Sequence, residues 1–228
     1  MTIQLTRLQM TELLYSLKGD SMNSPYHTFQ KFITINFNEK EMPSFISKTS
    51  KKKQHKEYGL STNEIVSLAN LCELTSLKST SIQNWIKRDI KELIGPPELG
   101  KKYSIDQAAM LLIVKDLKTS LDFEKIRNSL TIVFNTLSDR SDDLISPIAF
   151  YEIYAKAVSS FDILPALKIK DLTINQLIVE KIDQVDKSSL NLTDHQWKTI
   201  KPVLVIAVLS VIASHFQTLA HIYLTDML

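Results

Sequence analysis

Glycine is scarce in this chain, with only 4 among 228 residues. Because glycine supplies backbone conformations that other residues avoid, this scarcity disfavours folds with many tight turns or Gly-rich phosphate-binding loops. The sequence also lacks the GxGxxG, P-loop, GxSxG and HExxH patterns of common enzyme sites. We therefore predict a protein that is not an enzyme, with no catalytic residues and no cofactor.

Cysteine is nearly absent too, since Cys72 is the one cysteine of the sequence. A single cysteine cannot form an internal disulfide, which favours a reducing, cytoplasmic location. The N-terminal stretch MTIQLTRLQMTELLYSLKG has no long apolar run followed by small residues, so a signal peptide is not predicted. The 5 histidines show no spacing typical of metal ligands, and no metal site is expected.

Positive charge is unevenly distributed along the sequence. Lys48 to Lys102 contains 11 lysines and arginines against 6 acidic residues, so this segment carries +5 although the whole chain carries +2. A basic segment on a mildly acidic body is typical of proteins that contact nucleic acid. Chance clustering explains the charge equally well when it is taken alone.

Helix starts are frequent. The capping pattern Ser/Thr-x-x-Glu/Gln, in which two side chains satisfy free backbone N–H groups, occurs five times. Its positions are Ser61–Glu64, Thr80–Gln83, Ser104–Gln107, Thr173–Gln176 and Thr193–Gln196. Ser146-Pro147 marks a further start. This frequency predicts a mainly α-helical protein, with one short strand as an option where Ile33, Ile35 and Phe37 alternate with polar residues.

The order of the predicted elements divides the chain into three parts. Residues 1–57 hold an N-terminal helix and a basic linker, and residues 58–137 hold a winged helix-turn-helix domain. Residues 138–228 form an all-helical dimerisation or effector region, with helices at about 147–163, 174–186 and 194–226. Pro202 lies inside the last of these and is expected to end or kink it.

A short helix near 61–72, a polar turn, a second helix from residue 79 and the return GPPELGKKY follow the order of a winged helix-turn-helix. The second helix would enter the major groove, where Asn and Gln pair with adenine and Arg or Lys with guanine. Its candidate DNA-binding residues are Thr80, Ser81, Gln83, Asn84, Lys87 and Arg88. The wing candidates are Lys101, Lys102 and Tyr103, and a basic arm could include Lys51, Lys52 and Lys53.

Structural roles compete with these assignments. Gln83 could close a capping box with Thr80 instead of contacting a base. Arg88 could pair with Glu92 one helical turn away. Trp85 follows the apolar stripe and is expected to pack in the core, and Tyr103 also suits packing.

The segment LKSTSIQNWIKRDIKELIGPPELGKKYS resembles the corresponding part of MerR-type regulators. It is closer still to the YkrK-type proteins, a bacterial family of uncharacterised proteins with a MerR-like helix-turn-helix. The resemblance covers about residues 58–137 and implies a dimeric transcription factor, most simply a repressor. The chain departs from typical MerR regulators, because about 57 residues precede the domain and no cysteine follows it; a metal effector is therefore not implied.

The segment from Pro202 to Thr225 contains no charged residue. Its length would suffice to cross a bilayer. However, His215, Gln217 and His221 would then lie in hydrocarbon, so a helix in a dimer core is favoured over a membrane span.

These features together predict a homodimeric, cytoplasmic repressor that binds a pseudo-palindromic site in double-stranded DNA, with an unknown small-molecule effector as an option. One alternative is a protein-interaction module on a winged-helix scaffold. The other is a regulator tethered to the membrane by its C-terminal helix.

Overall fold

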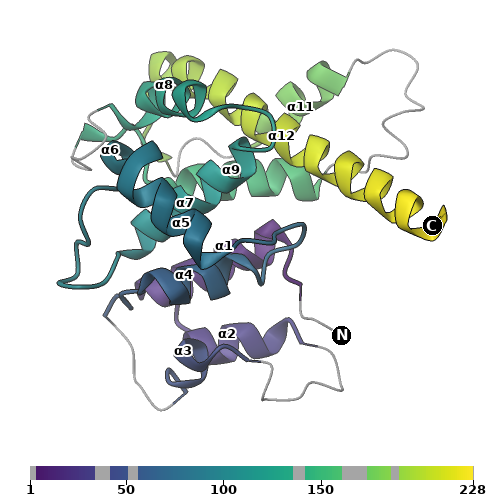
Figure 1. Ribbon diagram of the computed structural model, residues 1–228. Helices are drawn as coiled ribbons and strands as arrows, with labels where there is room; N and C mark the ends of the chain where they lie inside the picture. Colours follow the sequence, from purple (N-terminus) through teal and green to yellow (C-terminus); the bar gives the residue numbers. More distant parts are fainter. Residues whose placement is uncertain are drawn as a thin grey trace. The chain divides into compact units, whose positions relative to one another are not determined.

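The computed structural model describes residues 4–33, 42–50, 56–135, 142–160, 174–185 and 190–227. The chain divides into two compact units, Met1–Leu111 and Leu112–Leu228. Helices dominate both units, and the described ranges contain no named strand (Figure 1). The mainly α-helical class predicted from the capping patterns is therefore confirmed. The three predicted domains, 1–57, 58–137 and 138–228, stay a prediction, since compactness alone does not test them.

The first unit is built from short helices around a buried apolar core. They are α1 (Arg7–Lys18), α2 (Pro25–Lys31), α3 (Ser44–Ser47), α4 (Thr62–Ala69), α5 (Ser79–Asn84), the π-helix η2 (Trp85–Asp89), α6 (Lys91–Ile94) and the start of α7 (Ile105–Leu117). The helices α1 and α2 contact each other, as do α4 and α5. The apolar stripe of α1, from Met10 to Leu17, is fully buried, so this helix belongs to the core of the unit.

The chain just before α1 is tied to the end of α4. The backbone N–H of Leu5 donates to the carbonyl of Leu71 at 2.6 Å, and the Leu5 carbonyl accepts from the N–H of Glu73 at 2.9 Å. The Arg7 guanidinium, 1% exposed, lies 3.2 Å from the carboxylate of Glu73. These bonds fix the N-terminal helix against the predicted DNA-binding segment.

Most capping predictions for the described residues are confirmed. Ser61 and Glu64 form the reciprocal box at α4, and Ser146 caps α9 with Pro147 in the first turn. Ser104 with Gln107 and Thr193 with Gln196 also exchange both bonds. The box predicted at Thr80 is wrong, because α5 begins after Lys78 and has no side-chain cap. Thr173 and most of the possible strand near Ile35 lie outside the described residues.

The predicted wing is a minimal turn without strands in the described chain. Leu99 and Lys102 exchange two backbone hydrogen bonds, of 3.0 and 3.2 Å, and Tyr103 pairs with Leu60. Pairing cannot extend past Leu99, since Pro96 and Pro97 have no N–H to donate. It stops after Tyr103 because Ser104 already caps α7. The helical class stands, and a strand-containing wing is not found in this segment.

The second unit contains the end of α7 with α8 (Phe123–Phe134), α9 (Pro147–Ser159), α11 (Ile174–Asp183) and α12 (Asp194–Met227). Helix α12 contacts α8, α9 and α11. The aromatic rings of Phe134, Phe150 and Tyr154 meet edge to face in the core, with centroids 5.7 and 5.9 Å apart. The hydroxyl of buried Tyr154 donates to Asp116 at 3.1 Å, which satisfies a polar group deep in the unit.

Pro202 was expected to end or kink its helix, and it does not end it. Helix α12 runs through it from Asp194 to Met227. Pro202 removes one hydrogen bond of the helix. Ile200, Val203 and Leu204, next to it, are at most 2% exposed. Their burial stabilises the helix on both sides of the proline, which faces solvent.

Candidate nucleic-acid interface

The turn between α4 and α5 is held by an amide side chain. The carbonyl oxygen of the Asn70 side chain accepts from the N–H of Leu77 at 2.7 Å, and its NH₂ donates to the carbonyl of Leu77 at 3.0 Å. One side chain thus closes the turn from both directions, which fixes the angle at which α5 leaves α4. This role was not predicted, because the partner lies seven residues away in an irregular segment.

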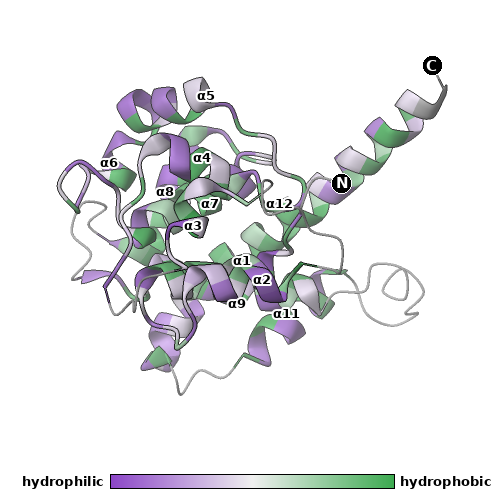
Figure 2. Ribbon diagram, turned by 90° about the horizontal axis from the view of Figure 1, so that it is seen from below, coloured by the Kyte–Doolittle hydropathy of each residue, from purple (hydrophilic) through white to green (hydrophobic). Residues whose placement is uncertain are grey.

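Helix α5 and η2 are anchored on one side by apolar residues. Ile82 and Ile90 are fully buried, as are Leu93 and Ile94 beyond them. The face away from these anchors is hydrophilic (Figure 2). Its exposed residues on α5 and η2 are Thr80, Gln83, Asn84, Lys87 and Arg88. They recur every three or four residues, so they follow a single side of the helical segment.

This exposed side of α5 and η2, here called the polar face, is positively charged. Lys87 and Arg88 carry two positive charges, and none of its five residues is acidic. Beyond the π-turn, Lys91 and Glu92 are both exposed on α6, and Asp89 is half-exposed. A row of amides and cations without carboxylates is suited to hydrogen-bond acceptors and phosphates.

The helix predicted to run from residue 79 to 94 is interrupted. Trp85–Asp89 form a π-helical turn, in which the N–H of Ile90 donates to the carbonyl of Trp85 at 2.9 Å. Ile90 then leaves helical geometry with φ −133°, and α6 follows as a separate turn. Single π-turns within helices are rare and recur at functional sites. Lys87 and Arg88, two of the predicted base-reading residues, lie on this turn.

Gln83 and Trp85 were each expected to have a structural role as an alternative to contacting DNA. Gln83 is exposed, and the absence of a side-chain cap on α5 removes the capping box that would have occupied it. Ser81 is half-buried and Trp85 is half-buried among its neighbours, so Trp85 is less deeply packed than expected. Among the candidates on this helix, Thr80, Gln83, Asn84, Lys87 and Arg88 are therefore accessible to a partner.

The two wing lysines have different surroundings. Lys101 is exposed at the tip of the turn. The Lys102 ammonium instead lies 3.1 Å from the Glu64 carboxylate and 5.1 Å from the centre of the Tyr58 ring. Burial raises the pKa of Glu64, but hydrogen bonds from Ser61 and Lys102 outweigh it and leave that pKa below its usual range. The Lys102 ammonium is thus already paired with Glu64 within the unit, a contact that could not be predicted from the sequence.

The wing turn also depends on a close backbone approach at Gly59. A Cβ atom placed on Gly59 would lie 2.9 Å from the Cβ of Lys102 and 3.3 Å from that of Leu99. Glycine therefore lets the segment before α4 run against the turn and allows Leu60 to pair with Tyr103. Tyr103 is half-buried beside it, and burial raises the pKa of its phenol, as packing predicts.

Buried Gln107 fixes the Gly-Pro-Pro loop that leads into the wing. Its NH₂ donates to the carbonyls of Ile94 and Pro96 at 2.6 and 2.7 Å, while its carbonyl oxygen accepts from the N–H of Ser104 at 2.9 Å. The sequence indicated only the capping bond of this residue. The additional bonds hold the loop against the start of α7.

One set of predicted site residues lies outside the described ranges. It is the proposed basic arm, Lys51, Lys52 and Lys53. Within those ranges, no group of three or more His, Cys, Asp or Glu residues could hold a metal ion.

Comparison with known proteins identifies the family. Residues 37–154, just over half of the chain, match the family described as Domain of unknown function (DUF1836), and the chain belongs to this family. The protein named "Uncharacterized protein YkrK" of Bacillus subtilis (strain 168) is 48% identical over 229 residues, covering 99% of this chain and 98% of that protein. The resemblance to YkrK-type proteins is therefore confirmed. No solved structure matches the chain.

Proposed function

We propose that the chain is a sequence-specific DNA-binding transcriptional regulator, a cytoplasmic homodimeric repressor of a pseudo-palindromic operator. The observation that supports this proposal is the polar face of α5 and η2, which is exposed, cationic and free of carboxylates. The buried Ile82 and Ile90 hold this face outward. A two-fold dimer would present two such faces to two half-sites.

The dimensions of the segment suit a major groove. Residues 79–89 extend over about 16 Å at the rise of a helix, and the groove is about 12 Å wide. In this reading Gln83 and Asn84 contact adenine, and Lys87 and Arg88 contact guanine or phosphate. Lys101, at the tip of the turn, contacts the phosphate backbone without reading sequence.

The same proposal assigns a MerR-like helix-turn-helix scaffold to the segment from α4 to α7. Its support is the order of elements: α4, a turn closed by Asn70, the α5–η2 helix, the short paired turn at Leu99–Lys102 and then α7. An effector that modulates binding would act on the helical second unit, where α12 contacts three other helices.

The test is an electrophoretic mobility shift with DNA taken from upstream of the protein's own gene, with competitor DNA present. A specific shift is expected, and Asn84→Ala should change which base is preferred at one position of each half-site. Asn128→Ala is the matched control, because Asn128 is an equally exposed asparagine on α8. Absence of specific shifts across a library of genomic fragments would refute the proposal.

A second candidate, a regulator tethered to a membrane, is favoured by one observation. Among the described residues, Asp194–Thr225 form a helix long and apolar enough to cross a bilayer, with a mean hydropathy of 2.0 over an 18-residue stretch. Cell fractionation separates the candidates: a tethered protein remains with membranes after a high-salt wash, whereas the proposed cytoplasmic dimer stays soluble.

A further inference from the structure

The first half of α12 has one side packed and one side open. Between Val203 and Ile212, the residues that contact the rest of the unit are almost completely buried; they are Val203, Leu204, Ala207, Val208, Ser210, Val211 and Ile212. On the opposite side Pro202 is exposed, Val205 and Ile206 are half-exposed, and Leu209 is 41% exposed. The helix therefore shows apolar side chains to solvent even where its own unit covers the other side.

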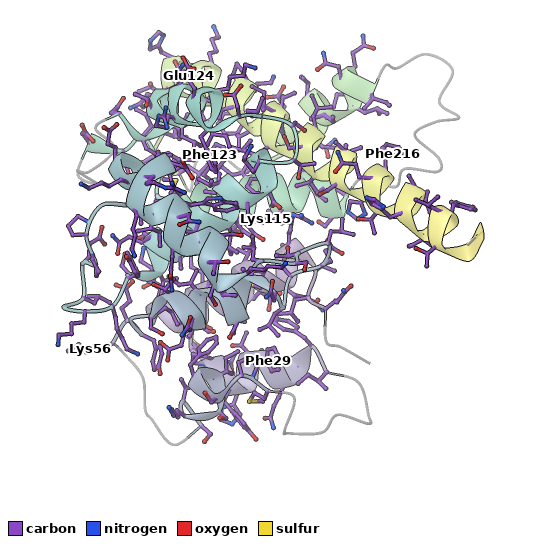
Figure 3. All side chains as sticks on the ribbon, in the orientation of Figure 1. Phe29, Lys56, Lys115, Phe123, Glu124 and Phe216 are labelled. Atoms are coloured by element: carbon purple, nitrogen blue, oxygen red, sulfur yellow. The ribbon has the colours of Figure 1, made fainter. Side chains whose placement is uncertain are left out.

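The second half of α12 continues this open apolar side. Phe216 is 46% exposed and Tyr223 is 65% exposed, and Phe216 lies at the surface of the helix in Figure 3. Leu219, Ile222 and Leu224 are exposed as well. No charged residue occurs between Pro202 and Thr225. An uncharged helix with a solvent-facing row of large apolar residues is a surface that a partner covers.

Part of the open side forms a seam with heptad spacing. The seam runs through Pro202, Ile206, Leu209, Ala213, Phe216, Ala220 and Tyr223, at intervals of four and three residues in alternation. Each of these residues is exposed or half-exposed. Such spacing keeps side chains on one side of a helix, as in a coiled-coil interface. The polar residues Gln217, Thr218, His221 and Thr225 follow another side.

Residue size alternates along the outer part of the seam. Leu209, Phe216 and Tyr223 are large and seven residues apart, whereas Ala213 and Ala220 between them are small. Two copies in parallel would place like against like, aromatic against aromatic and alanine against alanine. Two copies in antiparallel orientation place the large residues of one helix against the small residues of the other, which fills space without voids.

We propose that the outer part of this seam, residues 213–223, is a homodimer interface, in which α12 of two copies pair antiparallel, with Phe216 against Ala220 and Tyr223 against Ala213 of the second copy. The alternation of size makes the seam complementary to itself, which is the property that a two-fold interface requires. The lack of charges along it leaves no electrostatic feature that would select a different helix. The inference names the interface of the dimer assumed in the proposed function.

A bilayer fits the same seam less well. Only residues 216–225 are exposed almost throughout, since the Ser214 hydroxyl still bonds that of Thr119 at 3.2 Å. They extend over about 15 Å, against about 30 Å of hydrocarbon. Helices that lie on membrane surfaces carry lysine and arginine on their polar side. Here that side holds amide, hydroxyl and imidazole groups without a basic cluster.

The first test measures the mass of the purified full chain by light scattering during gel filtration. The wild-type protein should elute at twice 26.0 kDa. Phe216→Glu should weaken dimerisation by roughly 100-fold or more, because it puts a carboxylate into a desolvated seam. His221→Glu is the control on the polar side and should stay dimeric, since His221 is exposed there. A monomeric wild type at micromolar concentration overturns the inference.

The second test uses cysteine cross-linking and does not depend on the folding of a charged variant. The double variant Ala213→Cys/Tyr223→Cys should form a disulfide-linked dimer on mild oxidation. Within one helix the two positions are about 15 Å apart, too far for an internal bond. Each single variant should remain uncross-linked, because an antiparallel pair separates identical positions. The wild type is the control, since its Cys72 is buried. A single variant that cross-links with itself indicates a parallel pair and overturns the inference.

The outcomes also separate this inference from the proposed function. A dimer that cross-links as expected but gives no specific DNA shift supports the seam and refutes the DNA-binding proposal. A monomer that still gives a specific DNA shift refutes the seam and supports the DNA-binding proposal. Sedimentation with vesicles of phosphatidylcholine and phosphatidylglycerol provides the membrane outcome: a monomer that sediments with them assigns the seam to lipid and overturns the inference.

Discussion

Lys101 and Lys102 are adjacent lysines on one turn, yet they should behave differently when replaced by alanine. Lys101 is exposed, whereas the Lys102 ammonium is 3.1 Å from Glu64 and 5.1 Å from the Tyr58 ring centre. Under the proposed function, Lys101→Ala should weaken binding to DNA of any sequence, and Lys102→Ala should leave it nearly unchanged. Stability should show the opposite pattern.

The magnitudes follow from counting contacts. A dimer loses two phosphate contacts when Lys101 is replaced, which lowers the slope of log affinity against log salt by about 1.8. Between about 50 and 200 mM salt, the wild-type affinity should therefore fall roughly 12-fold further than that of the variant. Lys102→Ala removes a partly exposed ion pair and a cation–π contact, which should cost about 1 kcal/mol of unfolding free energy.

The assay is fluorescence anisotropy of a labelled mixed-sequence duplex over a salt series, with urea unfolding of each variant in parallel. A mixed-sequence duplex suffices, because phosphate contacts do not depend on the operator. Equal loss of salt dependence in both variants would refute the argument that Lys102 is occupied within the unit. An unchanged slope in both would show that the turn does not approach the DNA backbone.

Three further predictions concern stability, each measured by urea unfolding. Arg7→Ala should cost about 2–4 kcal/mol, because it removes a fully buried cation from its pair with Glu73; a cost below about 1 kcal/mol would contradict this account. Tyr154→Phe should cost about 1–3 kcal/mol by leaving buried Asp116 without that donor, and no loss would show that Asp116 is satisfied by other groups. Burial raises the pKa of Glu57 above its ordinary value of 4.5, although the hydrogen bond from the N–H of Ile105 and the charge of nearby Lys18 act to lower it. The folded state therefore holds its proton more tightly, so this contribution is present below pH 4.5 and is lost as pH rises through the folded-state pKa. Glu57→Gln should remove that dependence while keeping an acceptor for Ile105, and an unchanged pH profile would contradict the assignment.

Local features of the fold were readable from the sequence. The caps at Ser61, Ser104 and Ser146 were predicted because a cap involves only the first turn of a helix. Each cap depends on residues within three positions of one another, where local backbone geometry determines the distance.

Features that depend on distant partners were missed. Lys102 pairs with Glu64, 38 residues earlier, so the sequence made it look as accessible as Lys101. The clamp by Asn70 and the loop bonds of Gln107 depend on tertiary packing in the same way. The π-turn at Trp85–Asp89 was hidden for another reason, because its side chains satisfy an α-helical pattern and only the backbone bond distinguishes it.

That π-turn makes the polar face sensitive to chain length as well as to residue identity. A π-turn holds one residue more than the α-helical turn it replaces, so deletion of one residue between Trp85 and Asp89 would let the segment close as regular α-helix. The two ends would keep their orientation, because the π-turn already accommodates the extra residue that the deletion removes. Because Ile82 and Ile90 remain the anchors of the two ends, the change would fall on Lys87 and Arg88 between them. A single-codon deletion here would thus change the groups offered to a partner on an otherwise intact scaffold, a route to altered recognition that needs no substitution.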